Sequence, residues 1–159
     1  MQALQRLLAG FDIERAVLDK AIAWWEGSQH GDGSWNYSDR GENKEDDPGF
    51  GAMTAGGGAS VIILRGLKGQ SGKFGASRKA VSWLGENFTV EEHAKAPENR
   101  LRFHYYYLYA LERLGDLAMV TKMGKHDWYA QGANWLLKQQ NGGMWSFTGL
   151  GMEISDTCF

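Results

Sequence analysis

The chain has 159 residues, which is the size of one ordinary domain and enough to bury a single apolar core. Aromatic residues make up 13% of it and charged residues 23%, so the composition excludes a disordered chain. The 17 basic residues nearly balance the 19 acidic ones, and the net charge of -2 excludes a broad basic surface for nucleic acid or an anionic membrane. We find no signal-peptide pattern and no apolar run long enough to span a bilayer, which leaves the localisation unknown.

Two further counts are unusual. The chain has 22 glycines beside two prolines, a composition typical of turns, but it also has seven tryptophans, which are typical of a packed core. Its one cysteine excludes an internal disulfide and any zinc module built from several cysteines.

In chain order, the apolar spacing predicts helices of two kinds. Amphipathic helices are expected from an N-cap at Asp12 to Gly27, over 77–88 and over 127–140, with Asp127 as an N-cap. More apolar helices, which should be buried on several sides, are expected over 54–67, 101–114 and 153–159. A capping-box pattern at 89–92 predicts one short additional helix, which must end before Pro97. We therefore predict an all-α fold.

A short pattern occurs twice, 110 residues apart. Residues 29–35 read QHGDGSW and residues 139–145 read QQNGGMW, so both fit Q-x-x-x-G-x-W. Trp25 and Trp135 keep the same offset, and a weaker copy lies around Trp83. The period is therefore about 52 to 58 residues, and the chain holds two full units and the start of a third. The residues that define the two motifs are Gln29, Gly33, Trp35, Gln139, Gly143 and Trp145.

Three consecutive glycines, Gly56, Gly57 and Gly58, stand in one of the predicted buried helices. Glycine there costs about 1 kcal/mol per residue relative to alanine. We expect that cost to be offset by a close approach of the backbone to a neighbouring helix or to a ligand.

Alternating outer and inner helices joined by Q-x-x-x-G-x-W turns resemble the terpenoid cyclase and protein prenyltransferase superfamily. The resemblance implies an α/α toroid, a ring of helical hairpins, and primarily structural roles for the two motifs. A closed ring needs about six hairpins, whereas this chain supplies about three. We therefore expect residues 1–159 to form one partial ring that is either a fragment of a longer protein or covered by association.

The resemblance also suggests a metal site. Asp156-Thr157-Cys158 resembles the D-x-C that supplies two zinc ligands in protein prenyltransferase β-subunits, and His104 is the candidate third ligand. The family's histidine follows D-x-C, whereas His104 precedes it. The alternative is that Asp156 caps a helix and Cys158 packs as a small apolar residue, in which case no cofactor is expected.

Aromatic residues crowd the inner helix expected over 101–114. Tyr105 and Tyr109 share one helical face and, together with Phe103, are candidates for lining a cavity, although such a stripe is more often part of the core. The acidic run at Glu42, Glu45, Asp46 and Asp47 does not match the D-x-D-D acid with which triterpene cyclases protonate an alkene. We interpret it as a solvated connector, so whether the chain is an enzyme stays open.

Three functions remain. The first is a repeat module of unassigned activity that acts as a scaffold or binding groove, with the rest of a longer chain, a second copy or an apolar ligand as its partner. The second is an isoprenoid-processing enzyme with an aromatic-lined cavity. The third is a carbohydrate-binding or carbohydrate-processing α/α barrel, which would need exposed tryptophans and a carboxylate pair in one cleft. The fold alone does not choose among them.

Overall fold

The computed structural model describes residues 14–37, 48–70, 72–98, 103–146 and 153–158. These residues form the helices α2 (Arg15–Ser28), α3 (Gly51–Leu67), α4 (Gly75–Glu86), α5 (His104–Leu117), α6 (Trp128–Gln139) and α7 (Glu153–Cys158). Outside the helices, the only β pairing in the described ranges is two isolated bridges at turns. The predicted all-α class is confirmed. None of the helices in these ranges has the length and apolarity to cross a bilayer.

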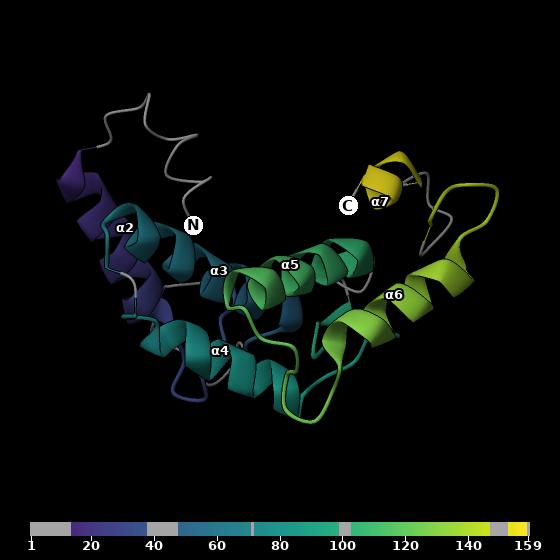
Figure 1. The fold of residues 1–159 in the computed structure, drawn as a ribbon, viewed down its shortest axis with the longest axis horizontal. Helices are drawn as coiled ribbons and strands as arrows, with labels where there is room; N and C mark the ends of the chain where they lie inside the picture. The colour runs from purple at the N-terminus through teal and green to yellow at the C-terminus, as the bar shows by residue number, and fades with distance from the viewer. Residues whose placement is uncertain (1–13, 38–47, 71, 99–102, 147–152, 159) are drawn as a thin grey trace.

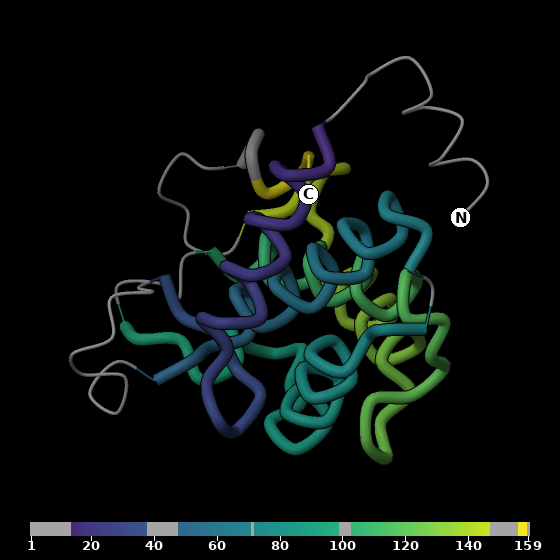
Figure 2. Tube along the Cα trace, turned by 90° about the vertical axis from the view of Figure 1, so that its left-hand side faces the viewer, coloured from purple at the N-terminus to yellow at the C-terminus, as the bar shows by residue number. Residues whose placement is uncertain are grey.

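The helices alternate between an outer and an inner position. In Figure 1, α2, α4 and α6 follow one another around the outside of an arc, while α3 and α5 lie on its inner side. Figure 2, which views the molecule from the side of α2, shows α4 below α3. The inner helix α3 packs most extensively against α5 and α4. Three hairpins in an arc agree with the predicted helical repeat, and a closed ring would require further hairpins.

The predicted helix boundaries are right to within about three residues. Asp127 is the N-cap of α6, as predicted, because its carboxylate accepts a hydrogen bond from the Ala130 N–H at 3.0 Å. The short helix expected from the capping box at 89–92 to a point before Pro97 is wrong: Thr89 Oγ1 accepts from the Glu91 N–H at 3.2 Å, which stabilises a turn instead of a helix. The predicted cap at Asp12 lies outside the described residues.

The core is centred on α3. Ten of its 17 residues are buried, as the apolar sequence predicts. A Cβ on Gly57 would lie 2.8 Å from the Trp35 ring, and one on Gly58 would lie 3.0 Å from the Ala80 methyl group. By contrast, a Cβ on Gly56 would meet nothing within 4 Å. Close packing therefore explains two of the three glycines and does not explain Gly56.

The third hairpin is packed less completely than the first two. Trp128 is the one buried residue of α6, with its ring against Gly115 of α5 and its Nε1 donating to the Val120 carbonyl at 2.7 Å. Farther along the same helix, Leu137 is 70% exposed. The hairpin is thus attached at the start of α6, and the rest of that helix leaves much of its surface open.

Candidate functional site

The first motif ties two outer helices together. Gly33 has φ +96°, a left-handed conformation that favours glycine, and a Cβ there would lie 2.8 Å from the Lys79 carbonyl oxygen. The Gln29 side-chain amide donates to the Gly33 carbonyl and to the Ala76 carbonyl, both at 2.9 Å. Because Gln29 ends α2 and Ala76 lies in the first turn of α4, this amide joins consecutive hairpins.

Trp35 completes this turn from inside the protein. Its side chain is 1% exposed, and its Nε1 donates to the Trp25 carbonyl at 2.9 Å. Its backbone N–H donates to Thr54 Oγ1 of the inner helix at 3.2 Å. The tryptophan therefore fastens the turn to both the outer and the inner helix of its own hairpin.

The second motif repeats these contacts. Gly143 has φ +83°, Trp145 Nε1 donates to the Leu136 carbonyl at 2.8 Å, and the Trp145 N–H donates to Thr157 Oγ1 at 3.0 Å. Thr157 of α7 therefore takes the place that Thr54 has in α3. Three features differ: the carbonyl that accepts from Nε1 is one position farther along the helix than the counterpart of Trp25, Trp145 is only half-buried, and Gln139 is exposed.

The weak middle copy uses a different junction. Asn87 stands 58 residues after Gln29, but its shorter side chain donates back to the Trp83 carbonyl of its own helix at 2.9 Å. At this junction the rings of Phe88 and His126 stack with centroids 4.5 Å apart, in addition to the contacts of Trp128. Trp83 Nε1 also donates to Asp32 Oδ2 in the first turn at 3.0 Å.

A pocket of about 320 Å³ lies between α5, the second motif and α7. Both tyrosines that the sequence analysis names as cavity candidates line it, Tyr105 being 3% exposed and Tyr109 being 43% exposed. Trp145 of the turn and Asp156 of α7 also line it. The remaining lining residues are Leu108, Glu112, Leu136 and Thr157.

The pocket combines aromatic faces with negative charge. Burial raises the pKa of Tyr105, and the nearby Asp156 carboxylate raises it further, so the phenol stays protonated near neutral pH. Glu112 pairs with Arg113, whose Nε lies 2.6 Å from the Glu112 carboxylate, and the guanidinium stands 5.8 Å from the centroid of the Tyr109 ring. Asp156, which is 5% exposed, is the buried carboxylate of this wall.

The other candidate residues lie elsewhere. Phe103 is half-buried at the N-cap position of α5 and does not line the pocket. His104 is fully buried, with Nε2 3.1 Å from the Val90 carbonyl and its ring 4.7 Å from the Trp135 ring centroid. Burial lowers the pKa of His104 to about 4, so the ring is neutral at physiological pH. Its contacts support the start of α5.

The proposed metal ligands do not gather. Among the described residues, no three histidine, cysteine, aspartate or glutamate side chains form a group that could hold a metal ion. Asp156 is buried beside the pocket, Cys158 is exposed, and His104 is packed among aromatic rings. The acidic run at Glu42, Glu45, Asp46 and Asp47 lies outside the described residues.

Sequence reasoning did not place Glu112 or Trp145 in the pocket, and it missed one structural histidine. Glu112 follows Tyr105 by seven residues and Tyr109 by three, so helical spacing alone would have placed it on their face. Trp145 acts both in the turn and in the pocket wall. His93 is buried and accepts from the Ala52 N–H at 3.0 Å, which satisfies a donor in the first turn of α3, and no local pattern indicates this contact.

We compared the chain with family models, with curated proteins and with solved structures, and found no match in any of the three. Its candidate function therefore depends on the geometry of the chain itself.

Proposed function

We propose that this chain is an α/α repeat module that binds a small ligand in the pocket between α5 and α7. The observation that carries this proposal is the convergence of Tyr105 and Tyr109, Trp145 and Asp156 from three separate elements on one pocket of about 320 Å³. A pocket of that size with mostly apolar walls and a few placed polar groups is typical of small-molecule sites.

The lining favours an apolar ligand that carries a positive charge. Aromatic faces attract cations through their quadrupoles, most strongly where water is excluded. The Asp156 and Glu112 carboxylates both lie in this wall, and Glu112 forms an ion pair with Arg113. The expected ligand is therefore an organic ammonium compound with an apolar body.

Benzyltrimethylammonium and its uncharged isostere neopentylbenzene test this proposal, with binding measured by calorimetry or tryptophan fluorescence. We expect the wild-type protein to bind the cation at least tenfold more tightly than the isostere. Asp156→Asn should reduce that preference, because it removes the carboxylate charge, keeps the shape and leaves the aromatic faces in place. Tyr109→Leu should weaken binding of both probes. Tyr129→Leu is the matched control, because Tyr129 is 65% exposed and lies outside this pocket.

Equal affinity of the two probes, or an unchanged preference in Asp156→Asn, would contradict the ammonium ligand. A soluble oligosaccharide should be assayed alongside, because Glu112, Asp156 and Trp145 in one cleft are the combination that sugar binding needs. Saturable sugar binding that Trp145→Ala abolishes would replace the proposal with the carbohydrate function.

The second candidate is the isoprenoid-processing enzyme, which the aromatic lining of the same pocket favours. Its test is turnover of squalene or a prenyl diphosphate, with Asp156→Asn as the loss-of-function variant. Metal analysis of protein purified without chelator belongs to this test, since a zinc-dependent transferase would carry about one equivalent. If neither turnover nor bound metal is found, these tests leave ligand binding as the proposed function.

The third hairpin also offers an edge for assembly. Leu137 and Met144 are 70% and 51% exposed, and Gln139 stands where Gln29 holds the next outer helix. We expect this edge to pack against a further hairpin, in a longer chain or in a second copy. Sedimentation of wild type and Leu137→Glu checks self-association, and a wild-type monomer at all concentrations would contradict it.

A further inference from the structure

A second and larger pocket is lined by residues of α3, α4 and the segment that follows α5. Its volume is about 650 Å³, and it lies between α4 and the end of α5. Apolar side chains make up most of its wall, with Ile62, Phe74 and Val81 on one side and Leu117 and Val120 on the other. It shares no lining residue with the ammonium pocket.

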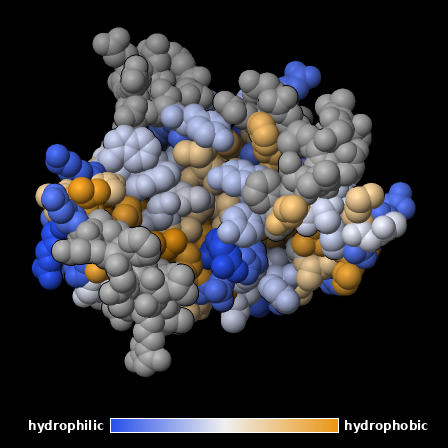
Figure 3. Space-filling view, turned by 90° about the horizontal axis from the view of Figure 1, so that it is seen from above, coloured by the Kyte–Doolittle hydropathy of each residue, from blue (hydrophilic) through white to orange (hydrophobic). Residues whose placement is uncertain are grey.

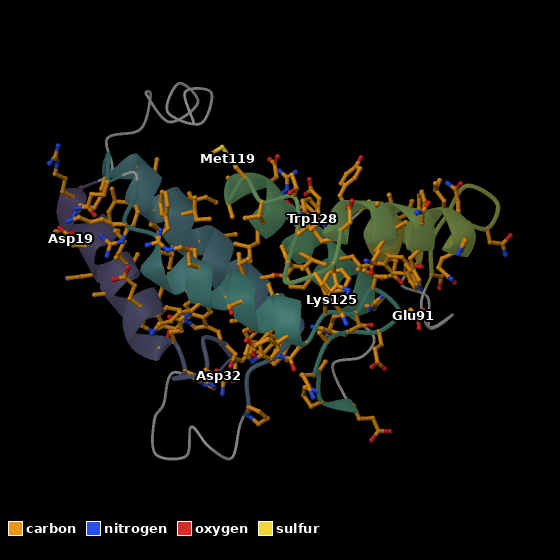
Figure 4. All side chains as sticks on the ribbon, turned by 60° about the horizontal axis from the view of Figure 1, so that its bottom comes forward. Asp19, Asp32, Glu91, Met119, Lys125 and Trp128 are labelled. Carbon is orange, nitrogen blue, oxygen red and sulfur yellow. The ribbon has the colours of Figure 1, made fainter. Side chains whose placement is uncertain are left out.

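The rim of this pocket contains an exposed methionine. Met119 lies just beyond the end of α5 with φ +53°, and 86% of its surface is exposed. Figure 4 shows its side chain projecting outward from the helices. Methionine is flexible and adapts to irregular apolar ligands. Figure 3 shows the face seen from above, on which hydrophilic, intermediate and hydrophobic residues are mixed.

The segments that border this pocket are basic. Residues 69–86 contain Lys73, Arg78 and Lys79 and one acidic residue, Glu86, and residues 117–126 contain Lys122 and Lys125 and no acidic residue. Arg78 itself lines the pocket and is exposed at its edge. The acidic lining residue, Glu86, is exposed at the other end of α4 and accepts a hydrogen bond from Ser82 Oγ at 3.5 Å.

An apolar pocket with a cationic edge suits a molecule with an apolar chain and an anionic head. We propose that this pocket binds a single-chain anionic amphiphile, a long-chain carboxylate, with its chain against Phe74, Val81 and Leu117 and its head at Arg78. The volume falls within the range of small-molecule sites. A guanidinium can hold a carboxylate through two parallel hydrogen bonds, which explains the choice of an arginine at the edge. The proposed ligand is a single dissolved long-chain carboxylate and not the surface of a lipid bilayer.

Displacement of dansyl-labelled undecanoate from the full chain tests the proposal, with laurate and methyl laurate as competitors. We expect saturable binding, with laurate the stronger competitor. Arg78→Gln should weaken laurate about tenfold and leave methyl laurate unchanged, because only the charged head meets the arginine. Ser82→Trp should weaken both by filling the pocket from an exposed position. Lys138→Gln on α6 is the matched charge control.

Absence of saturable binding, or an unchanged laurate affinity in Arg78→Gln, would overturn the proposal. Binding seen only with phosphatidylglycerol vesicles would also overturn it, because the anionic partner would then be a lipid surface. If Ser82→Trp does not fold, Met119→Asp replaces it, since aspartate tolerates a positive φ and brings negative charge to the rim. Benzyltrimethylammonium binding should be the same in wild type and Arg78→Gln, which separates this site from the other pocket.

Discussion

The two copies of Q-x-x-x-G-x-W build nearly the same turn in very different surroundings. In both, a glycine with positive φ precedes a tryptophan whose Nε1 bonds to the outer helix and whose N–H bonds to a threonine of the inner helix. Yet Trp35 is 1% exposed, whereas Trp145 is half-buried. The comparison shows that local sequence determines the turn, whereas the neighbouring hairpins determine how deeply it is buried.

Replacing the two tryptophans tests that distinction with the largest expected effect. Trp35→Ala should lower the free energy of unfolding by about 3 to 5 kcal/mol, because it empties a buried site against α3. Trp145→Ala should cost about 1 to 2 kcal/mol, because less apolar area is lost. Urea denaturation of both variants provides the measurement. Equal losses would mean that burial does not separate the two turns.

As the pH is lowered, the junction of the second and third hairpins should lose stability at a higher pH than the first turn does. His104 has a folded pKa of about 4 against 6.5 in the unfolded chain, so the unfolded state binds the proton more tightly. The contribution of the neutral His104 ring to the free energy of unfolding is complete above pH 6.5 and is lost as the pH falls toward 4. This contribution amounts to about 3 kcal/mol. Unfolding free energies measured from pH 7 to pH 4 should fall more steeply in wild type than in His104→Phe.

Asp32 in the first turn provides the contrasting case. Burial alone would raise its pKa, but hydrogen bonds from Ser34 and Trp83 outweigh burial and lower the pKa below 3.8. Its contribution is present above pH 3.8 and is lost only as pH falls through that lower value. If the unfolding free energies of wild type and His104→Phe fell in parallel as the pH was lowered, His104 would not be the source of the stability lost between pH 6.5 and pH 4.

Features that depend on local sequence could be predicted, whereas features that depend on how the hairpins pack could not. The all-α class, the Asp127 cap and the glycines of the two motifs depend on short-range chemistry and could be predicted. Tyr105 and Tyr109 could be placed on one face, but their meeting with Trp145 and Asp156 depends on how hairpins pack. His104 looked like a metal ligand because its type suits zinc, and burial among aromatic rings is invisible to a motif.

The glycines of α3 differ in their contacts with Trp35, the tryptophan of the first turn. Gly57→Ala should destabilise the protein by about 1 to 3 kcal/mol, because its Cβ would lie 2.8 Å from the Trp35 ring. Gly56→Ala is the matched control and should stabilise it by about 0.5 to 1 kcal/mol, because nothing lies near its Cβ and alanine favours helix. Thermal unfolding of both variants decides the sign. Destabilisation by Gly56→Ala would indicate an unrecognised contact on that face.

The two glutamines give the smallest and most specific contrast. Gln29→Leu leaves the Gly33 and Ala76 carbonyls without their partner and should cost about 1 to 2 kcal/mol. Gln139→Leu changes an exposed residue and should stay within about 0.5 kcal/mol. Both values should be measured at several protein concentrations. If the cost at Gln139 rises with concentration toward that at Gln29, a second copy is supplying the helix that α4 supplies to Gln29. A cost at Gln139 that stays small at every concentration would mean that its motif completes only its own turn.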